Sequence, residues 1–220
     1  MNQSRSAGMT ERRPARGAVR VEYVTLGWNC LEAIVAIVSG IIAASVALTA
    51  FGIDSGIELV SATVVLVRLR ALVAGGEPDD RKERRALRVV AVCFFALAGY
   101  VLIDASVSLA VGDRPAISPA GVAIAAAALI VMPTLAAAKR RIAVRLETGG
   151  LTGPAALLRA DAAETALCAI LAVTTLVGVG LNAAFGWWSA DPVASLAVVY
   201  FAIREGRETW AGELDCCDEN

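Results

Sequence analysis

Long apolar runs alternate with short polar and charged clusters along almost the whole chain. A run of about 20 apolar residues is long enough to cross a bilayer as a helix. Six such runs lie at residues 24–47, 49–70, 87–111, 118–138, 156–181 and 189–208. The pattern therefore predicts an all-α polytopic membrane protein with six transmembrane helices. These helices fill residues 23–210 and leave no room for a sizeable soluble domain.

The two ends of the chain differ from this membrane region. Residues 1–22 are polar and basic, and we expect them to form a disordered cytoplasmic tail. The apolar run that follows is too long for the core of a signal peptide, so the tail is not expected to be a cleaved leader. Residues 211–220 form a second, acidic tail that contains the adjacent Cys216 and Cys217.

Basic residues gather at alternate connections between the runs. Residues 1–22 carry five arginines, while the connections 68–88 and 139–159 carry seven and five lysines or arginines. Two more arginines close the last run, and Arg114 alone lies on the opposite side. By the positive-inside rule, both termini are expected in the cytoplasm, with the protein in the cytoplasmic membrane of a bacterium.

The composition argues against several other classes of protein. Hydrophobic residues make up 57% of the chain and aromatic residues only 5%, which suits a soluble globular domain poorly. Since the basic clusters are explained by orientation in the membrane, they do not indicate a nucleic-acid partner. Cys30, Cys93 and Cys168 fall inside apolar runs, so the five cysteines do not resemble an extracellular disulfide framework. The chain has no histidine.

Acidic residues interrupt the apolar runs, although an ionisable residue within the bilayer costs about 2.5–3.5 kcal/mol on insertion scales. They are Glu32 in the first run, Asp54 and Glu58 in the second, Asp104 in the third, and Asp161 and Glu164 in the fifth. No basic residue is expected at the same depth, so the acids have no predicted salt-bridge partner. Clustered carboxylates of this kind are typical of a cation site, and when empty they would hold protons instead.

The spacing of these residues brings four of them to one depth. Residues four apart share a helix face, so Asp54 points with Glu58, and Glu164 points with Cys168. Glu58 and Cys168 each lie roughly 15 Å along their runs at 1.5 Å per residue, near the middle of the bilayer. Three carboxylates and a thiolate from two helices would suit a tetrahedral divalent ion.

The sequences "DSGIE" at residues 54–58 and "ADAAETALC" at residues 160–168 resemble the transmembrane half of the cation diffusion facilitators. In that family an acid pair in the second helix faces a His/Asp and Asp pair in the fifth. "GIIAASVALTAFGIDSGIELVSA" and "WWSADPVASLAV" are also similar to the family's first-to-second helix junction and the start of its sixth helix. The resemblance covers about residues 22–210.

The resemblance implies export of a divalent transition metal through Asp54, Glu58, Glu164 and Cys168. Glu164 stands where the family usually has His or Asp, and Cys168 where it has Asp. A thiolate favours softer ions, so the transported metal is expected to be similar to Zn or Cd. The family's histidine-rich loop and cytosolic ferredoxin-like domain are missing, which makes this a short form. The resemblance also implies exchange with protons and a homodimer, with no resident cofactor.

Purely structural roles for these residues are also possible interpretations. Asp54 and Glu58 could hydrogen-bond between helices, Glu164 could reach toward the membrane surface, and Cys168 could be a small core residue. Glu32, Asp104 and Asp161 are either proton-relay groups, supporting groups around the metal, or hydrogen-bonding partners of neighbours. Asp161 could also stabilise a helix N-terminus. Cys216 and Cys217 either capture soft metals weakly or belong to an unstructured acidic tail.

Two rival functions remain at this stage. An intramembrane thiol-redox enzyme would use Cys168 or the Cys216 and Cys217 pair, but adjacent cysteines do not form a C-x-x-C redox motif. A membrane subunit that transports nothing would tolerate loss of Asp54 and Glu58. We expect a transporter and not an enzyme.

Overall fold

The structure is a computed structural model that describes residues 3–42, 46–76, 79–112, 118–187 and 189–211. Within these residues, all of the regular structure is helical and no strand is found. The six described helices are α1 (Gln3–Ile42), α2 (Val46–Val73), α3 (Asp80–Val111), α4 (Pro119–Thr148), α5 (Thr152–Phe185) and α6 (Ala190–Ala211). The prediction of an all-α protein with one helix for each apolar run is confirmed.

Four of these helices are long and apolar enough to cross a membrane, counted over the described residues alone. They are the Pro14–Ile42 part of α1, the whole of α3 and α4, and the Thr152–Val177 part of α5. α2 and α6 are not among the four. The four helices indicate a protein embedded in a membrane.

Short local signals set the ends of the helices. The side chain of Asp79 accepts hydrogen bonds from the backbone N–H groups of Arg81 and Lys82 and so caps the start of α3. A hydrogen bond from the Lys82 side chain, followed by these backbone bonds, holds the pKa of Asp79 below its usual value. Gly112 ends α3 in a left-handed conformation with φ of 69°, which glycine adopts without strain.

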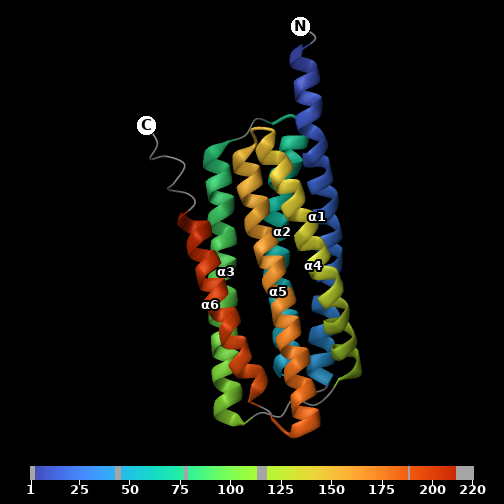
Figure 1. Ribbon diagram of the computed structural model, residues 1–220, viewed down its shortest axis with the longest axis vertical. Helices are drawn as coiled ribbons and strands as arrows, with labels where there is room; N and C mark the ends of the chain where they lie inside the picture. Colours follow the sequence, from blue (N-terminus) through green and yellow to red (C-terminus); the bar gives the residue numbers. More distant parts are fainter. Residues whose placement is uncertain (1–2, 43–45, 77–78, 113–117, 188, 212–220) are drawn as a thin grey trace.

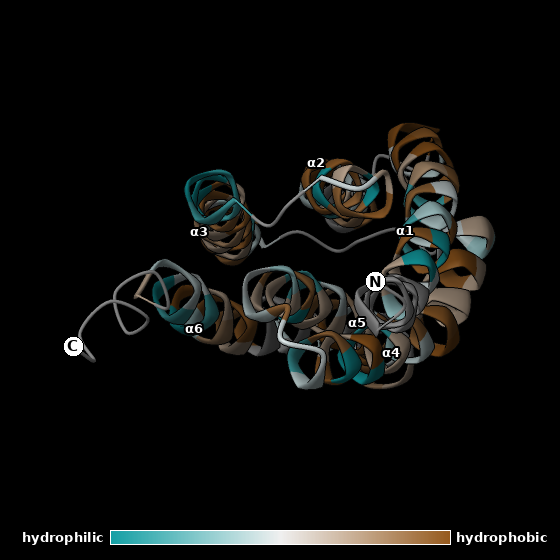
Figure 2. Ribbon diagram, turned by 90° about the horizontal axis from the view of Figure 1, so that it is seen from above, coloured by the Kyte–Doolittle hydropathy of each residue, from teal (hydrophilic) through white to brown (hydrophobic). Residues whose placement is uncertain are grey.

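The helices form two rows, as Figure 2 shows from above. α1, α2 and α3 lie in one row, and α4, α5 and α6 lie in the other. Across the rows, α1 packs on α4, α2 on α5, and α3 on both α5 and α6. α1 begins and α6 ends at the same end of the bundle (Figure 1).

Small residues let α1 and α2 approach closely. A Cβ atom added to Gly52 would lie 2.9 Å from the backbone nitrogen of Ile37 and 3.1 Å from the carbonyl oxygen of Ala33. Only a glycine leaves room for a backbone at this distance. This close pairing matters because both helices carry acidic side chains into the interior.

The outside of the bundle is largely apolar. Large aliphatic side chains are exposed on several helices, and Ile42 and Ile103 are 81% and 65% exposed. Soluble monomers rarely expose contiguous apolar patches of more than a few hundred Å², whereas lipid covers such surfaces in a membrane protein. Exposed Trp187 lies in the short connection between α5 and α6, and tryptophan is enriched at membrane–water interfaces.

One expectation for the ends of the chain differs from the structure. Residues 3–22 were predicted to be disordered but are the first turns of α1. Ala15 and Ala18 are fully buried in the same apolar cluster as Ala143 and Leu146 near the end of α4. Small residues on one face therefore pack this basic segment against α4. Of the other tail, residues 212–220 lie outside the described residues.

Candidate cation site

Buried polar side chains form a column between α1, α2, α4 and α5. These four helices contribute acidic, amide, hydroxyl, thiol and ammonium groups that are at most 3% exposed, although the outside of the bundle is largely apolar. The members are Glu22, Asn29, Glu32, Asp54, Ser55, Glu58, Ser61, Lys139, Asp161, Glu164, Thr165 and Cys168. We call this set the polar column.

The positively charged side chain of Lys139, from α4, lies at one end of the polar column. Its ammonium forms ion pairs with the carboxylates of Asp161 and Glu22, the second at 3.4 Å, and all three side chains are fully buried. Lys139 was predicted to lie in a cytoplasmic connection, and the buried acids were expected to lack a basic partner. Both predictions are wrong, because α4 continues to Thr148 and keeps Lys139 inside the bundle.

Asp161 is held by a second side chain besides Lys139. Ser61 of α2 donates a hydrogen bond to Oδ1 at 3.3 Å, while Lys139 binds Oδ2. α5 begins at Thr152, so Asp161 lies more than two turns inside the helix and does not stabilise its N-terminus. The Asp161 side chain therefore links three helices, since it lies on α5 and contacts Lys139 of α4 and Ser61 of α2.

A chain of hydrogen bonds leads from Lys139 to Glu58. The ammonium donates to Thr165 Oγ1 at 3.0 Å, and Thr165 Oγ1 lies 2.7 Å from Glu58 Oε1. The same hydroxyl lies 3.0 Å from the carbonyl oxygen of Asp161, one turn earlier in α5. Glu58 is therefore linked to the ion-paired end of the column through one side chain.

Asp54 lies one turn from Glu58 and faces α5. The Cys168 thiol lies beside its carboxylate, which brings together two residues that were predicted to share a site. Glu32 of α1 lies close to both Glu58 and Asp54, with Ser55 beside it. The structure thus places Glu32 next to the predicted acid pair and adds a third helix to the site.

Glu164 also reaches the column. Its side chain is 2% exposed and lies near Ser61 of α2, with Asp161, Glu58 and Asp54 as the acids around it. Burial at this level excludes the interpretation in which Glu164 extends to the membrane surface. It faces α2, as the predicted four-residue site requires.

Many acceptor atoms of the column have no hydrogen-bond partner among the described residues. A buried polar group without a partner costs about 1–3 kcal/mol, so such groups are uncommon and require an explanation. Both carboxylate oxygens of Glu32 and Glu164 are in this state, together with Glu22 Oε1, Asp54 Oδ2, Glu58 Oε2 and Asn29 Oδ1, while Glu22 Oε2 has only its ion pair with Lys139. A cation bound among these oxygens would give them a partner.

The side chains are not gathered into a finished metal site. Within the part of the chain that the structure describes, no three His, Cys, Asp or Glu side chains lie close enough together to hold a metal ion. Asp54 and Cys168 are in contact, but Glu58 and Glu164 are directed to Thr165 and Ser61 instead. Binding of an ion would require Glu164 to turn toward the unpartnered oxygens of Asp54 and Glu58.

The polar column as defined does not include Asp104. Asp104 is half-buried on α3, one turn after Tyr100. Cys216 and Cys217 fall outside the described residues, so the structure gives no view of a metal-capturing tail.

Sequence reasoning missed the part of the column that surrounds Lys139. Lys139 follows the alanines of "LAAAKRR" and looks like the first residue of a basic connection. Glu22 lies in a segment expected to be disordered, and Thr165 carries no charge that would single it out. One sequence signal could have pointed to Thr165: it lies four residues after Asp161 and so shares a helix face with that acid.

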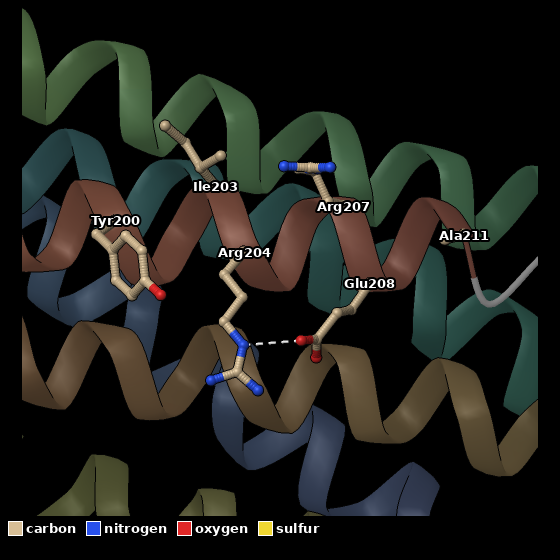
Figure 3. A pocket seen from close by; sticks show the side chains of 6 residues that line it. All are labelled: Tyr200, Ile203, Arg204, Arg207, Glu208 and Ala211. Carbon is tan, nitrogen blue, oxygen red and sulfur yellow. Dashed lines mark hydrogen bonds and ion pairs between the residues drawn. The ribbon is translucent and has the colours of Figure 1, made fainter.

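A shallow groove on α6 also carries charged side chains. Figure 3 shows its lining, with the Arg204 Nε donating to Glu208 Oε1 at 2.8 Å. It encloses about 450 Å³ and is open to the outside. The lining residues are Tyr200, Ile203, Arg204, Arg207, Glu208 and Ala211. None of them belongs to the polar column.

Comparison with known proteins adds no assignment: a scan against protein-family models gave no match, and neither did a search of curated proteins.

Proposed function

We propose that the protein is a membrane transporter that exports a divalent transition-metal cation in exchange for protons. The observation that carries the proposal is the polar column, in which buried carboxylates have oxygens without partners inside a bundle of apolar helices. Such residues are expensive in a membrane and mark ion pathways and proton relays. The resemblance of the "DSGIE" and "ADAAETALC" segments to the cation diffusion facilitators supports the same function.

The charge of the column favours a cation as cargo. Among the described residues it contains six acidic side chains and one ammonium, that of Lys139. Lys139 is engaged by Glu22 and Asp161, and so offers no direct ion pair to Asp54 or Glu164. An incoming divalent cation would offset part of the remaining negative charge.

The donor atoms indicate which metals would be carried. We propose Asp54, Glu58, Glu164 and Cys168 as ligands, with Glu32 as a supporting acid or proton carrier. Oxygen ligands alone suit hard ions such as Mg²⁺, whereas a thiolate favours softer ions such as Zn²⁺ and Cd²⁺. Cys168 is in contact with Asp54, so the soft ligand is already beside a carboxylate.

Proton exchange follows from the chemistry of these ligands. Carboxylates and thiolates bind a metal only when deprotonated, so metal binding releases protons and proton binding releases the metal. If the site opens alternately to the two sides of the membrane, each cycle moves metal one way and protons the other. The proton gradient then provides the driving force for export.

We further propose six membrane crossings with both termini in the cytoplasm of a bacterium. The distribution of lysines and arginines supports this orientation, since all but Arg114 and the buried Lys139 belong to one side of the six-helix arrangement. The common end of the bundle at which α1 begins and α6 ends agrees with an even number of crossings. A homodimer remains a proposal from the family resemblance.

Flux measurements on purified protein in proteoliposomes test the function. Under a pH gradient we expect uptake of Zn²⁺ or Cd²⁺, with no uptake by the Asp54→Ala and Glu58→Ala proteins. Glu83→Gln is a matched control, because Glu83 is a buried acid outside the polar column that pairs with Arg68. Absence of flux for Zn²⁺, Cd²⁺, Mn²⁺, Fe²⁺ and Co²⁺ in folded protein would exclude a transporter of these metals.

A selectivity experiment addresses the role of Cys168. In Cys168→Asp protein we expect Zn²⁺ flux to persist and Cd²⁺ flux to weaken, because a hard ligand replaces the thiolate. Cys93→Ser is the control, since Cys93 is also a buried free cysteine but lies on α3. Equal Cd²⁺ flux in Cys168→Asp and wild-type protein would remove Cys168 from the ligand set.

A further inference from the structure

The inference concerns the link between Lys139, Thr165 and Glu58, and it rests on the proposed function because it treats Glu58 as a metal ligand. Lys139 and Thr165 come from α4 and α5, while Glu58 comes from α2. All three side chains are buried. Their arrangement suggests a role for the Lys139 ammonium and the Thr165 hydroxyl in metal binding by the Glu58 carboxylate.

The hydroxyl of Thr165 has one proton and two lone pairs. Lys139 has only donors, so Thr165 Oγ1 must accept the hydrogen bond of 3.0 Å from the ammonium. The proton of Thr165 is then left to donate, and Glu58 Oε1 at 2.7 Å is nearer than the Asp161 carbonyl oxygen at 3.0 Å. The direction of the chain is therefore from Lys139 through Thr165 to Glu58.

This direction leaves the two oxygens of Glu58 in different states. Oε1 accepts the hydrogen bond from Thr165, whereas Oε2 is buried and has no partner among the described residues. Asp54, one turn earlier on the same helix face, also has one buried oxygen without a partner, Oδ2. One oxygen from each acid thus remains available to a cation.

Lys139 is itself fixed by more than Thr165. Glu22 of α1 and Asp161 of α5 bind its ammonium, and Ser61 of α2 holds the other oxygen of Asp161. All four helices around the column therefore determine where the ammonium lies. A donor fixed in this way can hold Thr165 in a single orientation.

We propose that Lys139 and Thr165 are positioning residues that fix one oxygen of Glu58 and leave the other for the transported cation. Glu58 then contributes a single oriented oxygen, and less side-chain freedom is lost when the metal binds. Groups that orient a metal ligand in this way are typically worth roughly 10–100-fold in metal affinity. Lys139 acts on the metal through Thr165 and Glu58 and does not bind it.

Thr165→Val removes the hydroxyl with little change in shape, and its effect is measured as the dissociation constant for Zn²⁺ alone by calorimetry on purified protein. We expect binding to weaken roughly 10–100-fold. Thr165→Ser keeps the hydroxyl and should retain wild-type affinity. Thr174→Val is the matched control, because Thr174 on the same helix bonds only to the backbone oxygen of Leu171 in the described contacts.

A double-mutant cycle separates positioning from a general effect on folding. If Thr165 acts through Glu58, adding Thr165→Val to Glu58→Gln protein should weaken Zn²⁺ binding no further than Glu58→Gln alone. A purely structural role would lower affinity by the same factor in both backgrounds. Additive losses, or wild-type affinity in folded Thr165→Val protein, would overturn the inference.

Three further outcomes are distinguished. If Thr165→Val does not fold, Thr165→Ala is measured in the same cycle and is read in the same way. If wild-type protein binds Zn²⁺ and transports it while Thr165→Val matches it, the positioning role fails and the proposed function stands. If wild-type protein binds no Zn²⁺ at all, the proposed function fails first and the inference fails with it.

Discussion

At the scale of single residues, Lys139 shows how a cation becomes stable in the interior of an apolar bundle. Its ammonium is fully buried, donates hydrogen bonds to Asp161 and Thr165, and forms a second ion pair with Glu22. A buried charge is tolerated only when it is paired and hydrogen-bonded. Removing one member of such a group leaves the others buried without compensation, and the cost of that loss is large.

This argument predicts a strong effect of Lys139→Met on stability. Glu22 and Asp161 would lose their shared cation, and breaking a buried pair in this way typically costs about 3–5 kcal/mol. The measurement is thermal unfolding in detergent, followed by circular dichroism. Lys82→Met is the control, because Lys82 is 65% exposed and its pair with Asp79 is on the surface. A Lys139→Met protein as stable as wild type would contradict the buried triad.

At the scale of elements, the pairing of α1 with α2 sets the positions of Glu32, Asp54 and Glu58. Gly52 allows the two backbones to approach, since a Cβ there would lie 2.9 Å from the backbone nitrogen of Ile37. Gly56, one turn later, has no atom within 4 Å of the corresponding position. Gly56 therefore serves as a control for Gly52, because both lie in α2 but only Gly52 is tightly packed.

We expect Gly52→Ala to destabilise the protein by about 1–3 kcal/mol, the usual cost of inserting a methyl group into a tightly packed contact. Gly56→Ala should leave stability unchanged or raise it by up to about 1 kcal/mol, because alanine favours a helix over glycine. Chemical unfolding of both variants checks the difference. Equal stabilities for the two variants would show that α1 and α2 do not approach as described.

The elements also show how far sequence reasoning reaches. Runs of apolar residues predicted each helix, because a segment of that length and composition has few alternatives to a helix in a membrane. The i,i+4 spacing of Asp54 and Glu58 likewise predicted a shared face, and the structure joins Asp54 to Cys168. The extensions of α1 and α4 past their apolar runs were not predicted, since they depend on packing between distant segments.

The same limit explains the missed members of the site. Glu22 and Lys139 are 117 residues apart in the chain, and no local pattern pairs them. Positive charge after an apolar run normally marks the cytoplasmic surface, and Arg140 and Arg141 beside Lys139 fit that rule. Lys139 departs from it because a second element, the start of α1, brings a carboxylate to meet it.

At the scale of the whole molecule, the proposed orientation rests on charge and on an even number of crossings. We expect a fluorescent reporter that folds only in the cytoplasm to be active when fused to either terminus. A phosphatase reporter that is active only outside the cytoplasm should be inactive at both ends. Phosphatase activity at one terminus alone would mean an odd number of crossings and would contradict the six-helix arrangement.

The central claim is that the polar column exchanges a divalent cation for protons. Titration calorimetry of Zn²⁺ binding in buffers with different ionisation enthalpies measures both events together. The account predicts a binding heat that depends on the buffer, which shows proton release, and loss of binding in Asp54→Asn/Glu58→Gln protein. Zn²⁺ binding that releases no protons, or that persists in the double variant, would contradict it.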